Sequence, residues 1–353
     1  MKNSNSKSRV FLYYPVFFFL VLLVLDKIFT IDYFKNNFLQ TGNIVYYKHR
    51  PVLFEKLKQD KSDKKLLLAF GDSRAYAYSE LAFKENNERK EKYSIYNFSG
   101  PQAVPAYTLF WMEKIIEAKI HPEFIFFVVS PEGFDDSKGL MHDPFLRMGA
   151  NDEFVQKYWK QIPSDDRQEY ILDKLVAFRK LELNYKLLIE RIRSKKLSEY
   201  DIKTNSEMPL LDISKGSQLA YMSFVNDEKR LEADSLRMKN FYLGKNFKQN
   251  ETQYFFTEKV LELARDNHIK VFLIWPRVYK TYRKEYERLD LKSSFGKRMT
   301  DLAEKYGMFF YDLNTVSDCD EFYDASHQSV SCYGKIVNYF VGEYEKITTD
   351  GHR

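Results

Sequence analysis

The chain has 353 residues, with 55 Lys and Arg against 50 Asp and Glu and a formal net charge of +5. This length allows one large domain or two modest ones, each with a buried core. Two cysteines exclude both a disulfide scaffold and a zinc site built from four cysteines. Lys2, Lys7 and Arg9 carry part of the positive charge, and no basic stripe interleaved with aromatic residues follows. The composition therefore argues against nucleic acid as a partner.

The N-terminal segment is strongly apolar, because residues 10–25 contain no charged or amide side chain. A helix over residues 10–31 would be about 33 Å long, enough to cross a hydrocarbon core of about 30 Å. No small residues around Leu25 and Asp26 offer a signal-peptide cleavage site. We expect a single-pass signal anchor in the inner (cytoplasmic) membrane that contacts lipid through residues 10–31. The basic residues before it predict a cytoplasmic N-terminus and an extracytoplasmic (periplasmic) main domain. A cytosolic protein with a buried N-terminal helix is the alternative.

The rest of the chain predicts a short stalk followed by one long domain. Residues 32–63 have no clear periodicity, and we expect a membrane-proximal stalk there. Within residues 64–348, short apolar runs predict five buried strands, at residues 66–70, 93–98, 124–129, 270–275 and 308–313. Apolar residues at helical spacing predict helices between them, at residues 104–116, 252–267 and 299–306 and after Gly334. Pro101 is expected in the first turn of the first of these helices.

Alternation of strands and helices predicts an α/β fold. We expect a three-layer sandwich, with a mainly parallel sheet and helices on both faces. Residues 131–250 are charged, helix-like and free of an obvious buried strand. They predict a helical insertion after the third strand that forms a cap beside the site.

Candidate catalytic residues follow the first and last predicted strands. Ligands of open parallel sheets bind beyond the carboxyl ends of the strands. Ser73 lies three residues beyond Phe70, and His327 precedes the last helix, with Asp324 three positions before it. A serine hydroxyl needs a base to become a nucleophile, and a carboxylate can hold the imidazole of that base in the required tautomer. These three residues predict a Ser-Asp-His triad.

The motifs that contain these residues resemble a known superfamily. Gly71-Asp72-Ser73 after the first strand, a glycine after the second, and Asp324-x-x-His327 before the last helix together resemble the SGNH (GDSL-type) hydrolases. The apolar N-terminus and Gly71-Asp72-Ser73-Arg74 are similar to membrane-anchored members that act in alginate O-acetylation and teichoic-acid D-alanylation. The resemblance covers roughly residues 64–348 without the insertion, and implies an SGNH-hydrolase or flavodoxin-like sheet.

The resemblance also implies roles for individual residues. Ser73 would be the nucleophile, Asp324 and His327 the acid and base, and the N–H of Gly100 an oxyanion donor. The superfamily places an Asn side chain as a further oxyanion donor after the third strand, and this chain has none there. Arg74 and Ser130 are candidate substitutes. Arg277 follows the fourth strand and could hold an anionic substrate.

Two functions follow from these features. The first is a serine esterase or O-acyltransferase that acts on an acylated envelope glycan or lipid, with a membrane acyl-export protein as a possible partner. The alternative is an inactive envelope protein that keeps the fold for binding or assembly, which the missing Asn favours. The chain has none of the motifs of zincins, P-loop proteins or dinucleotide-binding proteins, so we expect neither a metal nor a cofactor.

The two cysteines lie on either side of the Asp324–His327 segment. Cys319 and Cys332 are thirteen positions apart. An extracytoplasmic location would permit a disulfide between them, which would hold the acid–base loop. The alternative is two unrelated small buried residues.

Overall fold

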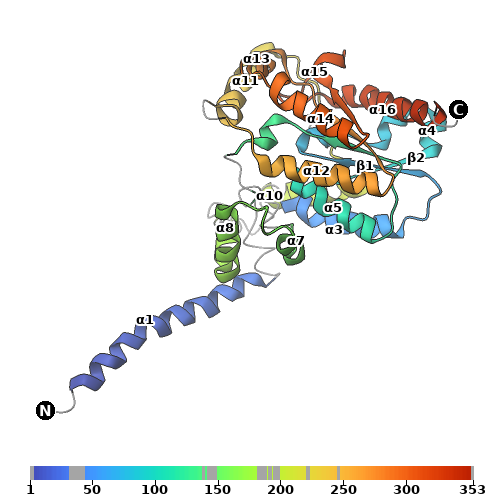
Figure 1. The fold of residues 1–353 in the computed structure, drawn as a ribbon. Helices are drawn as coiled ribbons and strands as arrows, with labels where there is room; N and C mark the ends of the chain where they lie inside the picture. The colour runs from blue at the N-terminus through green and yellow to red at the C-terminus, as the bar shows by residue number, and fades with distance from the viewer. Residues whose placement is uncertain are drawn as a thin grey trace.

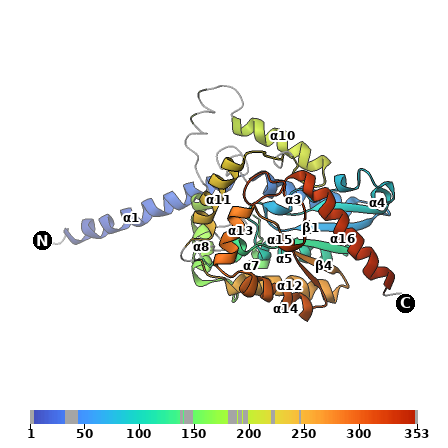
Figure 2. The same ribbon diagram turned by 90° about the horizontal axis from the view of Figure 1, so that it is seen from above.

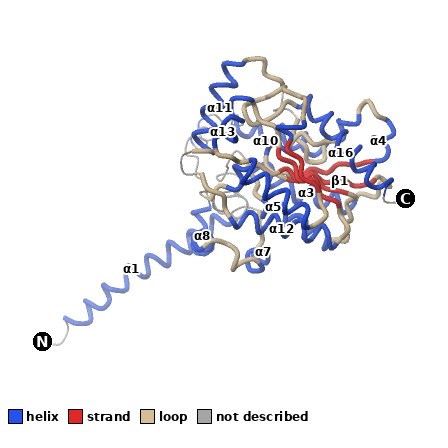
Figure 3. The backbone as a smooth tube through the Cα atoms, turned by 45° about the horizontal axis from the view of Figure 1, so that its top comes forward, coloured by secondary structure: helices blue, strands red, loops and turns tan. Residues whose placement is uncertain are grey.

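The computed structural model describes residues 4–31, 44–136, 140, 149–180, 189, 193, 199–219, 223–244 and 247–350. Its centre is one five-stranded sheet (Figure 3). The strands are β1 (Lys65–Phe70), β2 (Tyr93–Asn97), β3 (Phe124–Val128), β4 (Lys270–Trp275) and β5 (Phe309–Asp312). Their order is β2-β1-β3-β4-β5 and every pair is parallel. The predicted strands and the parallel α/β fold are therefore confirmed.

Helices cover both faces of this sheet. Alternate residues of β1 point to opposite faces, as in any strand, so Leu68 and Phe70 join one apolar cluster and Leu67 and Ala69 the other. The first cluster includes α5 (Pro105–Glu117), α12 (Glu251–Asp266) and α14 (Lys297–Lys305), and the second includes α16 (Val330–Asp350). Figure 1 shows α16 on one side of the sheet and α5 and α12 on the other. The helices predicted from apolar spacing thus supply both layers.

Helix α5 begins later than its proline signal predicted. Pro101 and Gln102 form a turn, in which Gln102 has a φ of 52°. Val104 is extended, and Pro105 occupies the first turn of the helix instead. A φ fixed near −65° suits both a turn and a helix start, so two nearby prolines could not be distinguished by sequence alone.

Part of the expected stalk belongs to the globular domain. Residues 44–59 form helix α3 (Ile44–Gln59), and residues 32–43 lie outside the described part of the chain. Leu53 and Leu57 of α3 are buried in the first apolar cluster, and Val45 and Tyr46 in the second. His49 and Arg50 are buried on the same helix. Because polar residues occupy buried positions, the apolar periodicity that would have predicted this helix is broken.

The insertion after β3 is helical where it is described. It contains η4 (Pro131–Phe134), α7 (Asp152–Lys157), α8 (Ser164–Leu175), η5 (Ala177–Lys180), α10 (Glu199–Ile213) and α11 (Glu228–Tyr242). Its only strand-like pairing among the described residues is a single bridge between Asp135 and Gln249. Figure 2 shows α10 and α11 apart from each other around the body of the domain. Shorter elements complete the fold: η1 (Lys27–Thr30), η2 (Ser73–Ala75), η3 (Glu80–Phe83), α4 (Asn87–Lys92), α13 (Lys280–Arg288), η6 (Lys292–Gly296) and α15 (Leu313–Val316).

Helix α1 (Ser4–Asp26) projects from the body of the domain (Figure 1). Its apolar side chains from Tyr13 to Leu20 are exposed. At its foot, Lys27 donates hydrogen bonds to the carbonyls of Lys174 and Leu175, at 3.2 and 2.6 Å. Among the residues that the structure describes, no helix combines the length and apolarity needed to cross a membrane. The single-pass anchor expected at residues 10–31 is therefore not confirmed.

Candidate active site

The turn after β1 presents Ser73 at the carboxyl edge of the sheet. Gly71 adopts a φ of 130°, and a Cβ on it would lie 2.4 Å from the carbonyl oxygen of Val128 in β3. Only glycine fits this close approach without a shift of the backbone. Asp72 then fixes the turn, because its Oδ1 accepts from the N–H of Arg74 at 2.9 Å and its Oδ2 accepts from the hydroxyl of Ser130 at 3.0 Å. Ser73 follows as the first residue of η2.

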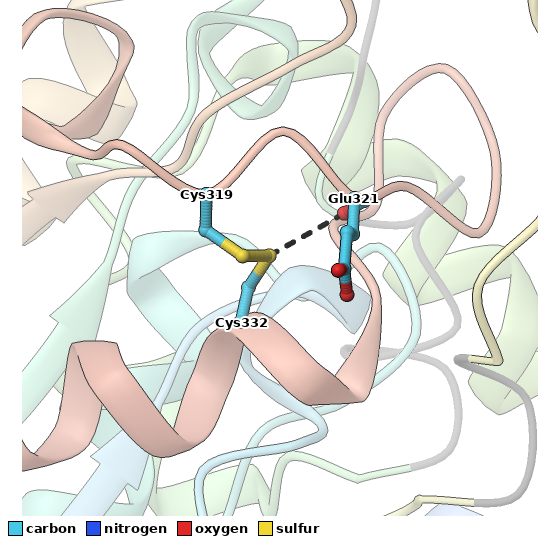
Figure 4. Close-up of side chains that lie close together, drawn as sticks. All are labelled: Cys319, Glu321 and Cys332. Atoms are coloured by element: carbon cyan, nitrogen blue, oxygen red, sulfur yellow. Dashed lines mark hydrogen bonds between the residues drawn. A yellow bond between two sulfur atoms is a disulfide. The ribbon is translucent and has the colours of Figure 1, made fainter.

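The acid–base loop lies between α15 and α16 and is closed by a disulfide (Figure 4). Cys319 and Cys332 are joined with an S–S distance of 2.07 Å and a Cα–Cα distance of 5.6 Å. Inside this ring, Phe322 and Gln328 form an antiparallel bridge, and the N–H of Ser329 donates to the carbonyl of Glu321 at 2.8 Å. Of the two alternatives for the cysteines, the structure contains the disulfide. It attaches the loop to the first turn of α16.

The three predicted triad residues lie in contact. Ser73 Oγ is 2.7 Å from His327 Nε2, although 254 positions separate the two residues. His327 Nδ1 lies 2.9 Å from each carboxylate oxygen of Asp324. With a proton on Nδ1 shared with the carboxylate, Nε2 is left to accept the proton of the Ser73 hydroxyl. This arrangement can raise the nucleophilicity of Ser73.

Asp324 is held as an ionised carboxylate. Its Oδ1 accepts from the backbone N–H groups of Ser326 and His327, both at 2.8 Å. Burial alone would raise the pKa of Asp324, but the nearby His327 and these hydrogen bonds outweigh it and lower the pKa to about 2. An ionised Asp324 therefore orients the imidazole at every pH well above 2.

Arg277 supports the acid–base loop instead of facing an open binding site. Its Nε and Nη2 donate to Asp320 Oδ1 at 2.9 and 2.6 Å, and its Nη1 donates to the carbonyl of Ser317 at 2.7 Å. The expectation that Arg277 binds an anionic substrate is corrected by these contacts, since its guanidinium is already paired. Arg277 follows β4, as the predicted strands indicated. Its acceptors, however, belong to residues about 40 positions later in the chain, which the sequence alone did not identify.

The cap contributes a further support to the same loop. Asp234 of α11 accepts a hydrogen bond from the N–H of Ala325 at 3.1 Å. The carbonyl of Ala325 accepts from the N–H of Tyr279 at 2.9 Å. The insertion therefore lies against the acid–base loop, as expected for a cap beside the site. Asp234 carried no signal in the sequence, because an acidic residue on an exposed helix is common.

Two of the donors implied by the resemblance are already in use. The N–H of Gly100 donates to the carbonyl of Gly71 at 3.0 Å, and Phe98 donates to Ala69 at 2.8 Å. These bonds continue the β1–β2 ladder beyond the strand ends. The hydroxyl of Ser130 likewise donates its hydrogen bond to Asp72 Oδ2. In this structure neither Gly100 nor Ser130 is a free donor toward an oxyanion.

Two buried residues that the sequence reasoning missed fix the loops around this edge. Asn97, at the end of β2, donates through Nδ2 to the carbonyls of Ala75, Tyr76 and Tyr78 at 2.7, 3.2 and 3.1 Å. Arg50 of α3 donates to the carbonyl of Ser99 through Nε and Nη2, at 2.9 and 2.6 Å. They connect the loop after β1, the loop after β2 and helix α3. A polar residue at a strand end was the only signal for Asn97.

Arg74 and Glu132 form a buried ion pair next to the nucleophile. Arg74 Nη1 lies 2.8 Å from Glu132 Oε2, and the two side chains are only 6% and 3% exposed. Glu132 Oε1 accepts from the hydroxyls of Tyr282 and Tyr286, both at 2.7 Å. Burial would raise the pKa of Glu132, but the charge and hydrogen bond of Arg74 lower it to about 2. The pair is thus ionised on both sides.

No metal centre is indicated at this edge. Among the described residues, the group of possible metal ligands whose donor atoms lie together is Cys319, Glu321 and Cys332 (Figure 4). Both sulfurs belong to the disulfide, so neither is a thiolate ligand.

The fold and the site together define a parallel α/β protein with a hydrogen-bonded Ser-His-Asp arrangement at the carboxyl edge of its sheet. Residues 7–344 match the family DUF1574, described as "Protein of unknown function", and the chain belongs to that family. Curated proteins give no significant match to the chain.

Proposed function

We propose that this protein is an SGNH-like serine esterase or O-acyltransferase. The observation that carries the proposal is the contact of Ser73 Oγ with His327 Nε2 at 2.7 Å, together with the contacts of His327 Nδ1 with Asp324 at 2.9 Å. Three residues from opposite ends of the chain meet in the order that acyl transfer requires. The disulfide, Arg277 and Asp234 all restrain the loop that supplies two of the three.

The proposed reaction has two halves. Ser73 Oγ attacks the carbonyl carbon of an ester while its proton passes to His327 Nε2. The bond from that carbon to the leaving oxygen then breaks, and His327 returns the proton to the leaving alcohol. In the second half, a water or an acceptor hydroxyl loses a proton to His327 and attacks the acyl carbon. The bond from that carbon to Ser73 Oγ then breaks, and His327 returns the proton to Oγ. Water gives hydrolysis and a sugar hydroxyl gives transfer, and the triad requires no cofactor for either.

The substrate class and location follow from the resemblance and from two features of the chain. We propose an acylated envelope glycan or lipid as substrate, with a membrane acyl-export protein as a possible partner. The Cys319–Cys332 disulfide favours an oxidising, extracytoplasmic compartment. The exposed apolar side chains of α1 favour contact of residues 10–31 with membrane lipid. The basic residues Lys2, Lys7 and Arg9 before them favour an N-terminus on the cytoplasmic side.

A second function is supported by a specific observation. The superfamily's Asn is missing, the N–H of Gly100 donates to Gly71, and the hydroxyl of Ser130, a candidate substitute, donates to Asp72, so the set of oxyanion donors is incomplete. Loss of one such donor typically lowers the rate by about 10²–10³-fold. An inactive envelope protein that uses the same edge for binding or assembly would tolerate that loss.

Ester hydrolysis by the full chain distinguishes the two functions. With p-nitrophenyl acetate as the probe, the catalytic proposal predicts that Ser73→Ala and His327→Ala each lower kcat by about 10³-fold or more. Ser164→Ala is the matched control, because Ser164 is a serine at the start of α8 outside this edge. Hydrolysis that is equal in the wild type, Ser73→Ala and Ser164→Ala would exclude the catalytic function.

A further inference from the structure

The structure raises the question of which side chain stabilises the oxyanion in place of the missing Asn. Of the four residues suggested by the sequence for the oxyanion or the substrate, three are occupied: Gly100 by Gly71, Ser130 by Asp72, and Arg277 by Asp320 and two backbone carbonyls. The fourth candidate, Arg74, directly follows the nucleophile in the chain. Its surroundings differ from those of the other three.

Arg74 is held in place, but not all of its side-chain N–H groups donate to a protein acceptor. Only its Nη1 is engaged by Glu132, at 2.8 Å, with Asp72 Oδ2 at 3.9 Å from the same nitrogen. Its Nε and Nη2 donate to no residue in the described part of the chain. Neither nitrogen is among the fully buried atoms that have no hydrogen-bond partner. These two nitrogens therefore keep N–H donors that no described residue accepts. A guanidinium carries five N–H donors in a rigid plane, so one edge can be held while the other binds.

The partners of Arg74 hold it at both ends. Its backbone N–H donates to Asp72, and its carbonyl accepts from the hydroxyl of Tyr333 at 2.7 Å. At the other end, Tyr282 and Tyr286 of α13 donate to the Glu132 oxygen that Arg74 does not use. The carboxylate is thereby kept in place with both oxygens engaged. Residues of η4 and α13 thus hold the guanidinium, while Asp72 and Tyr333 of α16 hold the backbone of Arg74, which directly follows Ser73 in the chain.

We infer that Arg74 donates the side-chain hydrogen bond that stabilises the oxyanion, and that Glu132, Tyr282 and Tyr286 are positioning residues for its guanidinium. The inference rests on the proposed function. When Ser73 Oγ bonds to the carbonyl carbon, the π electrons of that carbonyl move to its oxygen, and Arg74 Nε or Nη2 donates to this oxygen. Glu132 balances the charge of Arg74, so the buried cation needs no permanent anion from the substrate. The site would therefore accept esters of neutral acyl groups.

Two variants test the role of Arg74 on p-nitrophenyl acetate, a neutral acetyl ester. Arg74→Ala is expected to lower kcat by about 10²–10³-fold with little change in KM, because the interaction forms only in the transition state. Added methylguanidinium should restore part of kcat in Arg74→Ala and have no effect on Ser73→Ala. A structural role would not give this rescue.

A double variant removes the objection that an unpaired Glu132 unfolds the protein. Replacement of a buried ion pair by apolar residues of similar size is often neutral for stability. Arg74→Met with Glu132→Leu leaves no unpaired charge but takes the acceptor from the hydroxyls of Tyr282 and Tyr286, so we expect a lower Tm in a protein that still folds. This folded variant should lose the same 10²–10³-fold in kcat. Glu132→Gln, which keeps the shape and removes the charge, should lower kcat about tenfold, with a smaller loss in Tyr282→Phe.

The matched control is Arg89→Gln. Arg89 pairs with Glu345 at 2.8 Å beside the amino ends of the strands, away from Ser73, and its loss should leave kcat unchanged. A folded double variant that keeps kcat within threefold of the wild type would overturn the inference. The inference would also fail if Arg74→Ala keeps the wild-type rate, or if methylguanidinium does not restore its lost rate. If the wild type and Ser73→Ala hydrolyse the ester equally, the proposed function fails instead. The two failures are thus distinguishable.

Discussion

Substitution of Asp324 by Asn tests how Asp324 orients the imidazole of His327 while the conformation of the loop is kept. Asp324 Oδ1 accepts from the N–H groups of Ser326 and His327, both at 2.8 Å. An Asn side chain must keep its oxygen there, because an amide nitrogen cannot accept these bonds. Its NH₂ group then takes the place of Oδ2 beside His327 Nδ1. Because Nδ1 lies 2.9 Å from both oxygen positions, this NH₂ group competes with the remaining oxygen for Nδ1. It favours an imidazole that accepts at Nδ1 and carries its proton on Nε2, where it can no longer accept the proton of Ser73.

The size of the effect follows from this change of tautomer. The equivalent substitution in a Ser-His-Asp protease lowers kcat by about 10⁴-fold with the geometry intact, and we expect a similar loss for Asp324→Asn. Stability should change in a pH-dependent way. Because the folded-state pKa of Asp324 is lowered from 3.8 to about 2, ionisation contributes about 2 kcal/mol to the free energy of unfolding. This contribution is fully present above pH 4 and disappears as the pH falls toward 2.

The assay compares Asp324→Asn with the wild type in ester hydrolysis and in urea unfolding between pH 2 and pH 7. We expect the variant to be less stable by up to about 2 kcal/mol at pH 7 and equal at the acid end. Asp266→Asn serves as the control, since that carboxylate is exposed and pairs only with its neighbour Arg265. The reasoning is refuted if Asp324→Asn keeps kcat within tenfold of the wild type, or if its stability deficit grows on acidification.

Three further predictions concern the scaffold of the site. Cys319→Ser with Cys332→Ser should lower the free energy of unfolding by about 3 kcal/mol, given the separation of 13 residues, as measured by urea unfolding; an unchanged midpoint would contradict this. Gly71→Ala places a Cβ 2.4 Å from the Val128 carbonyl, so we expect a sharp drop in Tm by calorimetry, and a wild-type Tm would show that the turn can relax. Asn97→Ala removes one donor from three carbonyls that each keep another, and leaves the buried N–H of Ser99 without its acceptor. It should cost about 1–3 kcal/mol in urea unfolding, whereas no cost would mean that water replaces the amide.

The sheet could be predicted from the sequence because its strands are buried on both faces. Most of the strands are continuous apolar runs, and a run of five residues such as Phe124–Val128 is too short for a typical helix and is typical of a strand inside a parallel sheet. The positions of Ser73 and His327 followed, since the carboxyl ends of parallel strands lie at one edge. The fold and the candidate triad were therefore accessible without coordinates.

The contacts that hold the site residues in place could not be predicted from the sequence in the same way. The sequence predicted a stalk in place of helix α3 because the polar residues His49 and Arg50 occupy two of its buried positions and interrupt the apolar period. Whether the N–H of Gly100 is free depends on how far the β1–β2 ladder continues, and no local pattern encodes that. The pairing of Arg74 with Glu132 joins residues 58 positions apart. Such contacts are set by tertiary packing, so residue type and spacing identify the candidates but not their partners.

Covalent labelling tests the central claim most directly. The full chain is treated with a fluorophosphonate, which phosphonylates activated serines, and the adduct is located by peptide mass spectrometry. We predict one adduct on Ser73, formed at a rate that falls strongly in His327→Ala. Absence of an adduct in folded protein, or an adduct on another serine such as Ser326 with Ser73 unmodified, would contradict the assignment of Ser73 as the nucleophile.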